Sequence, residues 1–189
     1  VLDALRDYGV EKLYLFADAA KNPEHQDGVG QVRELLRSVD WAERELVERE
    51  TNFGLAKSII SAANHVFSSH DRILLLEDDI VPFPSLFPFL ENALYKYADD
   101  PRVTGISGYG VPQAEANRQR YPYDAWFFPR ISSWGWATWK RAWNRFNPDL
   151  RGLVDEAAKA NLDLTIGGTD LVRNLQHAFE GRDIWTMNW

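Results

Sequence analysis

Cysteine is missing from this chain of 189 residues, which excludes disulfide bonds and thiolate metal sites. The absence fits a reducing compartment, and we therefore expect a cytoplasmic protein. No apolar stretch approaches the roughly 20 residues that a membrane-spanning helix needs, and no secretory signal is visible. The sequence predicts no integral membrane segment.

An excess of positive charge is also missing, because 21 basic residues face 28 acidic ones and the formal net charge is −7. Without a basic run, a nucleic-acid backbone or an anionic membrane is not expected as the main partner. The four histidines show no metal-ligand spacing, and no nucleophilic serine motif is present. These absences favour a small or neutral partner.

What the chain has is enough apolar sequence for one sizeable core, with 45% hydrophobic residues. No internal repeat or low-complexity linker divides it, so we expect a single domain. Tryptophan is abundant: five of the eight lie between Trp126 and Trp143. Such rings stack on sugars and nucleobases, but they also fill hydrophobic cores.

Helix and strand patterns alternate over the first 108 residues, and this alternation predicts parallel strands with crossover helices in an α/β fold. The helix that leads into the first strand implies an earlier strand that this sequence lacks. The expected helices cover residues 1–8, 28–39, 55–67 and 85–97, and the expected strands cover 12–17, 46–49, 73–76 and 103–107.

The alternation stops after residue 108. Residues 109–123 are polar and suit a long loop over a cleft. An antiparallel strand is expected at 124–130 and a Gly- and Trp-rich turn at 132–136. Helices are expected at 137–145 and 170–180.

Three consecutive carboxylates, Glu77, Asp78 and Asp79, end the apolar run at 73–76. The run reads as a central strand buried on both faces, and Pro82 prevents its continuation. The acids therefore follow the carboxyl end of a strand, where ligands bind in open α/β sheets. Side-chain alternation predicts Glu77 and Asp79 on one face and Asp78 on the other.

Hard oxygen ligands in a cleft suit Mg²⁺ or Mn²⁺, with a diphosphate supplying further oxygens. The alternative interpretation is a solvated acidic turn after a strand, since Asp is a common turn former.

Several short motifs occur in a fixed order between about residue 12 and residue 189. They are Asn52-Phe-Gly-Leu-Ala-Lys57 before a helix, Glu77-Asp78-Asp79 closing a strand, Phe127-Phe-Pro129, Trp134-Gly135-Trp136, and Asp183-x-Trp185. Singly these motifs are weak, but their order and separation are specific. With them the chain resembles the GT-A glycosyltransferases, and most closely N-acetylglucosaminyltransferase I and its bacterial relatives.

The resemblance implies a Rossmann-like mixed sheet flanked by helices and lacking the family's first strand. It implies one partial GT-A catalytic domain over residues 1–189, with a nucleotide-sugar-binding half at 1–108 and an acceptor and catalytic half at 109–189. The implied activity is an inverting, metal-dependent transfer of a sugar from a nucleotide-sugar donor to the hydroxyl of a carbohydrate or other acceptor. A UDP-linked donor is expected, with UDP-GlcNAc as one candidate.

The resemblance also assigns roles to the acids. The last acid of the motif is the family's metal ligand, which carries over to Asp79 and to Mn²⁺ or Mg²⁺. Glu77 and Asp78 are then expected to face the donor sugar and the ribose. Asp18 matches the acid that binds the uracil ring, although an ordinary turn at the end of a strand explains it equally well.

An inverting transfer needs a general base for the acceptor hydroxyl. The resemblance points to Asp183, which precedes Trp185 as the family's catalytic acid precedes a Trp, although Ile184 stands where a second acid can occur. A helix-initiating Asp is the structural alternative. Asp170 is the competing base.

Trp134, Gly135 and Trp136 are expected to form a loop against the donor or acceptor sugar. Trp139 and Trp143 are four residues apart on a predicted helix, so we expect them in the core.

Two other functions fit the sequence. A sugar-nucleotide nucleotidyltransferase shares the alternating architecture but needs a Gly-rich basic loop after its first strand. A catalytically silent carbohydrate-binding domain could use the Trp-rich surface, and its affinity for sugar would survive EDTA.

Overall fold

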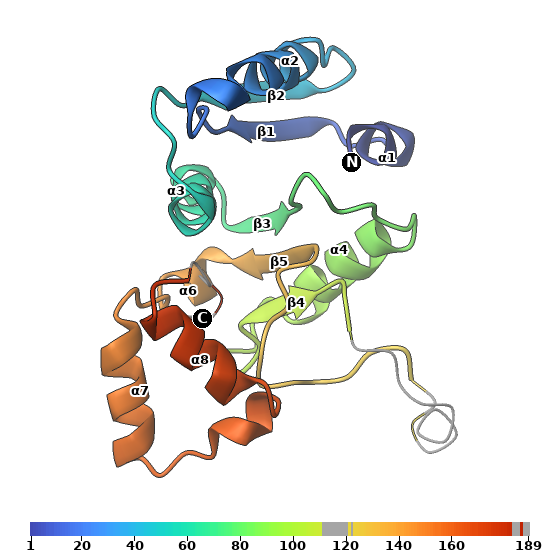
Figure 1. Cartoon of the computed structure of the whole chain (residues 1–189). Helices are drawn as coiled ribbons and strands as arrows, with labels where there is room; N and C mark the ends of the chain where they lie inside the picture. Colours follow the sequence, from blue (N-terminus) through green and yellow to red (C-terminus); the bar gives the residue numbers. More distant parts are fainter. Residues whose placement is uncertain (111–120, 122, 183–185, 187–189) are drawn as a thin grey trace.

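A computed structural model describes residues 1–110, 121, 123–182 and 186, which form a mixed α/β fold with two small sheets (Figure 1). The strands are β1 Lys12–Ala17, β2 Glu43–Glu48, β3 Arg72–Leu75, β4 Gly105–Ser107 and β5 Trp136–Trp139. The α-helices are α1 Leu2–Tyr8, α2 Gln26–Arg37, α3 Leu55–Phe67, α4 Leu86–Lys96, α6 Lys140–Trp143, α7 Leu150–Lys159 and α8 Leu171–Phe179, with 3₁₀ turns η1 Pro23–His25 and η2 Leu164–Gly167. None of the helices in these ranges has both the length and the apolar character that crossing a membrane requires.

The first sheet pairs β1 with β2 in parallel, in a register that runs from Lys12↔Glu43 to Ala17↔Glu48. The 3₁₀ turn η1 and helix α2 connect the two strands and cross over them (Figure 1). This unit confirms the expected parallel pair with a crossover helix.

The second sheet has the order β3-β5-β4, and β5 is antiparallel to both neighbours. The prediction that residues 73–76 form a central strand was wrong, because β3 lies at the edge of this sheet in the part of the chain that the structure describes. The central place goes to β5, whose backbone pairs on one side with β3 and on the other with β4.

The segment after residue 123 also departs from the prediction. Residues 136–139 are a strand, and the helix begins only at Lys140. Trp and Thr suit a pleated strand that is paired on both edges, so tertiary pairing overrides the helical spacing of Trp139 and Trp143. Residues 124–130 form no strand in the described ranges, and Pro129 lacks the amide hydrogen that a ladder needs.

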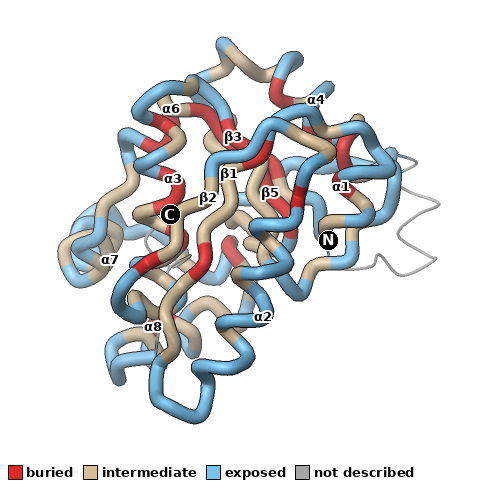
Figure 2. Tube along the Cα trace, turned by 90° about the horizontal axis from the view of Figure 1, so that it is seen from above, coloured by how far each residue is buried: buried red, intermediate tan, exposed pale blue. Residues whose placement is uncertain are grey.

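Both faces of β5 are buried, and they join two parts of the core. Trp136 packs with α3, β3 and Trp143, whereas Ala137 and Trp139 pack against α4 and β4. A third cluster joins α1, β1 and Phe87 of α4. Figure 2 shows buried stretches in α3, β3 and β5. Trp139 and Trp143 are buried as expected, although they come from different elements.

Candidate functional site

One edge of the second sheet brings the end of β3, which leads into the acidic motif, next to the start of β5, which follows Trp134. Because β5 is antiparallel to its neighbours, the carboxyl ends of β3 and β4 meet the amino end of β5. The last paired row is Leu75, Trp136 and Ser107. Two residues beyond that row, the three chain segments reach Glu77, Trp134 and Tyr109.

The acids lie in a turn beyond β3. The strand ends at Leu75, and the amide of Ile80 donates a hydrogen bond to the carbonyl oxygen of Glu77 at 3.2 Å. Side-chain alternation therefore does not extend to these residues, and the prediction that Glu77 and Asp79 share one strand face was wrong. Glu77 is half-buried, whereas Asp78 and Asp79 are exposed.

Glu77 lies near the loop that precedes β5, because the side chain of Ser133 in that loop is close enough to the Glu77 carboxylate to lower its pKa. Burial is the largest effect and raises the pKa of Glu77, and the negative charges of Asp79 and Asp78 raise it further, against the lowering effect of the Ser133 side chain. Glu77 therefore differs from its neighbours: it is a partly desolvated acid beside a second chain segment.

A divalent ion can be matched to Asp78 and Asp79 by their chemistry. Both carboxylates are exposed and form no hydrogen bond or ion pair with the described residues. The described ranges contain no group of three or more His, Cys, Asp or Glu that could hold a metal ion. Mg²⁺ commonly takes only one or two protein carboxylates and completes its shell with water and substrate phosphates. The free acids fit that kind of site.

Gly135 shapes the loop across from the acids. Its φ is +69°, in the left-handed region that favours glycine, and a Cβ there would lie 3.2 Å from the side chains of Leu76 and Leu86. Its carbonyl oxygen accepts a 2.6 Å hydrogen bond from the amide of Gly108. Gly135 thus fastens the ends of β4 and β5 together, and its predicted contact with a sugar stays a prediction.

The two tryptophans of the predicted sugar loop face different surroundings. Trp134 is 55% exposed, whereas Trp136 is 0% exposed and packs on Trp143 with ring centroids 6.1 Å apart. The assignment of Trp136 to the substrate site was wrong, because its place in β5 directs the ring into the core beneath α3. Trp134 alone keeps a ring free for a ligand.

Asp18 lies away from the other acids. In Figure 1, β1 and β3 run in opposite directions, so their carboxyl ends lie at opposite ends of the fold. The Asp18 carboxylate accepts hydrogen bonds from the amides of Ala19 at 3.1 Å, Phe53 at 2.9 Å and Gly54 at 3.1 Å. It thereby joins the end of β1 to the start of α3. Its role with uracil stays a prediction, because the end of β1 does not lie beside the acidic motif at residues 77–79.

Asp183 lies outside the described residues, so its role as base stays a prediction. The competing base, Asp170, is engaged: its carboxylate pairs with Arg130 at 2.9 Å and accepts a hydrogen bond from Asn174 at 2.8 Å. Arg130 lowers the pKa of Asp170 below its ordinary value. A carboxylate held in this way is a weaker proton acceptor.

The Arg130 pair predicts a pH-dependent contribution to stability. A depressed pKa means that the stabilisation is present above the ordinary value of 3.8 and is lost as the pH falls through the lower folded value. Because the pair is partly exposed and screened, Asp170→Asn should lower Tm by only about 1–2 °C at pH 7, and by less as the pH falls below about 4. Thermal unfolding of Asp155→Asn, which changes an exposed acid of α7, is the control. If Asp170→Asn lowered Tm equally at pH 7 and below pH 4, the ion pair between Asp170 and Arg130 would be contradicted.

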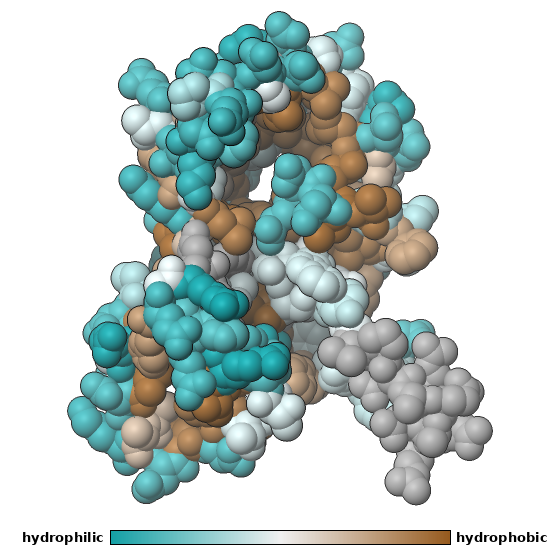
Figure 3. Space-filling view, viewed as in Figure 1, coloured by the Kyte–Doolittle hydropathy of each residue, from teal (hydrophilic) through white to brown (hydrophobic). Residues whose placement is uncertain are grey.

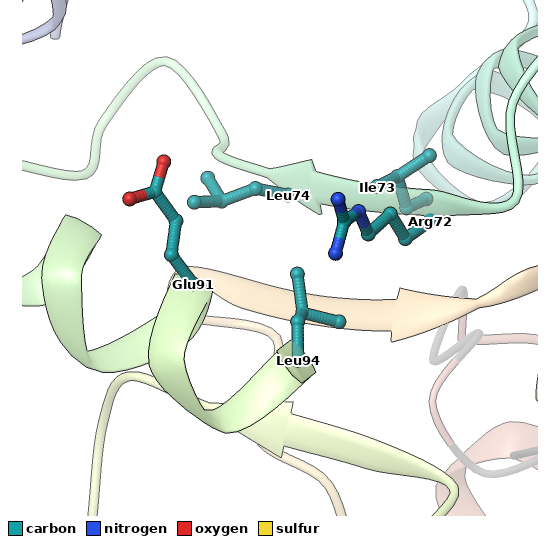
Figure 4. Close-up of a pocket in the computed structure, with 5 residues that line it drawn as sticks. All are labelled: Arg72, Ile73, Leu74, Glu91 and Leu94. Carbon is teal, nitrogen blue, oxygen red and sulfur yellow. The ribbon is translucent and has the colours of Figure 1, made fainter. Parts of the chain in front are cut away.

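Two cavities lie away from the acids. One of about 280 Å³ is lined by Arg72, Ile73 and Leu74 of β3 and by Glu91 and Leu94 of α4. In Figure 4, Arg72 and Glu91 reach into it from different elements. The other, of about 110 Å³, is lined by leucine, valine and alanine residues of α7, η2 and α8, where Figure 3 shows hydrophobic side chains at the surface. Neither cavity is lined by a predicted site residue.

Neither Tyr109 nor Ser133 is predicted from the sequence as a site residue. The ring of Tyr109 contacts that of Trp134, and the side chain of Ser133 lies near Glu77. Tyr109 follows its strand by the same two residues that separate Glu77 from β3. Counting two residues beyond each strand is the signal that could have found it.

Comparison with protein-family models and with curated proteins finds no match for this chain.

Proposed function

We propose that this chain carries the site of an inverting, metal-dependent glycosyltransferase of the GT-A type that uses a nucleotide sugar. One observation carries the proposal: the acidic motif follows β3 and the exposed Trp134 precedes β5 at the same end of the sheet, where Leu75 pairs with Trp136. The parallel β1–β2 unit with its crossover helix agrees with the α/β fold class of the proposed enzyme.

The division of labour follows from exposure and contacts. Asp79, assisted by Asp78, would hold the divalent ion, because both carboxylates are exposed and unengaged among the described residues. A bound Mn²⁺ or Mg²⁺ supplies Lewis-acid neutralisation of a diphosphate leaving group. Glu77, which is half-buried near Ser133, would accept hydrogen bonds from sugar hydroxyls.

The transfer is a single displacement. The acceptor oxygen forms a bond to the anomeric carbon while the bond from that carbon to the diphosphate oxygen breaks, and the configuration inverts. The acceptor proton passes to the carboxylate of Asp183, and the bonding electrons leave with the nucleoside diphosphate.

We expect Asp183→Asn to lower kcat by about 100-fold, the lower end of the usual contribution of a general base, while leaving UDP affinity unchanged. Steady-state transfer kinetics and a UDP titration measure the two quantities. Asp170→Asn is the control and should keep most of the activity. If Asp170→Asn lost more activity than Asp183→Asn, the two roles would have to be exchanged.

The function is tested by thermal unfolding of the full-length protein with UDP, UDP-glucose and UDP-GlcNAc, each with and without Mn²⁺. A ligand that binds only the folded state adds about 2.7 kcal/mol of apparent stability at 100 times its Kd. A metal-dependent rise in Tm supports a transferase. No rise with any uridine nucleotide would contradict it.

A catalytically silent carbohydrate-binding domain is the second candidate, favoured by the exposure of Trp134 and Tyr109. It predicts sugar affinity that survives EDTA and needs no nucleotide. Metal-dependent binding of UDP separates the transferase from this alternative.

A further inference from the structure

Two aromatic rings touch at the edge that holds the acids. The ring centroids of Tyr109 and Trp134 are 4.5 Å apart with an interplanar angle of 56°. The side chains are 42% and 55% exposed, so each presents ring surface to solvent while resting on the other. Together they form an aromatic platform, a name used below for this pair.

Hydrogen bonds next to the platform hold both of its segments. The hydroxyl of Ser107 donates to the carbonyl oxygen of Ser132 at 3.2 Å and accepts from the amide of Ser132 at 2.8 Å. The amide of Gly108 bonds to Gly135 across the same two segments at 2.6 Å. The backbones that carry the rings are therefore fixed, which lowers the entropic cost of binding a ligand.

Polar groups border the rings. Ser133 immediately precedes Trp134, and its side chain lies near the carboxylate of Glu77. Apolar ring faces beside a carboxylate and a hydroxyl match a pyranose, which combines a C–H face that packs on aromatic rings with hydroxyl groups that donate and accept hydrogen bonds.

We propose that Tyr109, Trp134 and Glu77 form a subsite for the pyranose ring of an acceptor carbohydrate. The C–H face of the sugar packs on the two rings, and a hydroxyl donates to Glu77. The designation of this sugar as the acceptor rests on the proposed function, whereas the stacking itself needs neither nucleotide nor metal.

The test is a titration of the intact protein with methyl β-D-glucopyranoside without metal or nucleotide, followed by saturation-transfer NMR and tryptophan fluorescence. Glycerol, which has hydroxyls but no ring face, is the control ligand. Trp134→Ala and Tyr109→Ala should each weaken binding about tenfold or beyond detection. Trp134→Phe should retain most of the affinity. Tyr95→Ala, which removes an 81% exposed ring on α4, should change nothing.

Equal affinity of the wild type and Trp134→Ala would overturn the subsite, as would no glucoside binding by a protein that circular dichroism shows to be folded. A Trp134→Ala variant that weakens UDP-glucose but not the glucoside would overturn the acceptor assignment.

UDP and Mn²⁺ binding, measured on the same variants, separates this proposal from the proposed function. Failure of the wild type to bind UDP, together with Trp134-dependent glucoside binding, refutes the transferase and retains the sugar-stacking site. The reverse pattern refutes the subsite and retains the transferase.

Discussion

Asp79→Asn is expected to lower metal-dependent sugar transfer by about 1,000-fold. Lewis-acid stabilisation of a leaving diphosphate is worth several kcal/mol, and each 1.36 kcal/mol of barrier is a factor of ten in rate. Asparagine keeps the size of the side chain and one oxygen but removes the charge that attracts the cation. Since Asp79 is exposed in a turn, the change should leave the fold intact.

The measurements are transfer kinetics across a Mn²⁺ titration and UDP affinity with and without the ion. Asp71→Asn is the matched control, because Asp71 is an exposed acid at the opposite end of β3. The control should behave like the wild type. Normal Mn²⁺-dependent transfer by Asp79→Asn would refute the metal assignment, and an equal loss in both variants would point to bulk charge rather than to a ligand.

Trp136→Ala is expected to lower the free energy of unfolding by about 3–5 kcal/mol, the usual cost of deleting a buried large aromatic ring. The ring is fully buried between α3, β3 and Trp143. The substitution would leave a cavity on the face of β5 that packs against α3 and Trp143. Urea unfolding measures this loss in the free energy of unfolding. The loss is smaller the further the surrounding side chains relax into the cavity.

The matched control is Trp134→Ala, two residues away, whose exposed ring should contribute about 0.5 kcal/mol. The two variants should therefore differ in what they lose: Trp136→Ala should lower the free energy of unfolding, and Trp134→Ala should weaken sugar binding. If Trp134→Ala were the more destabilising of the two, the register of β5 would be wrong.

Elements with a strong local pattern were predicted closely. The strand at 12–17 and the helix at 55–67 match β1 and α3, because apolar spacing there coincides with the buried face. The helix at 28–39 was displaced by two residues from α2, which begins at Gln26. Helix ends depend on weak terminal interactions, so such shifts are expected.

Residues 136–139 form a strand that the local sequence pattern does not predict. Trp139 and Trp143 have helical spacing, but β5 forms because β3 and β4, both distant in the sequence, offer it partners on two edges. No window of neighbouring residues contains those partners. The same non-local pairing separates Trp134 from Trp136.

Local sequence is sufficient to place three acids just past the carboxyl end of an apolar strand, since β-prone residues, prolines and charges act within a few residues of one another. Which of these acids is buried, which tryptophan is exposed, and that Tyr109 joins them depend on strands brought together from far along the chain. Hydrogen-bond register between such strands is a property of the folded sheet, and it assembles the candidate site.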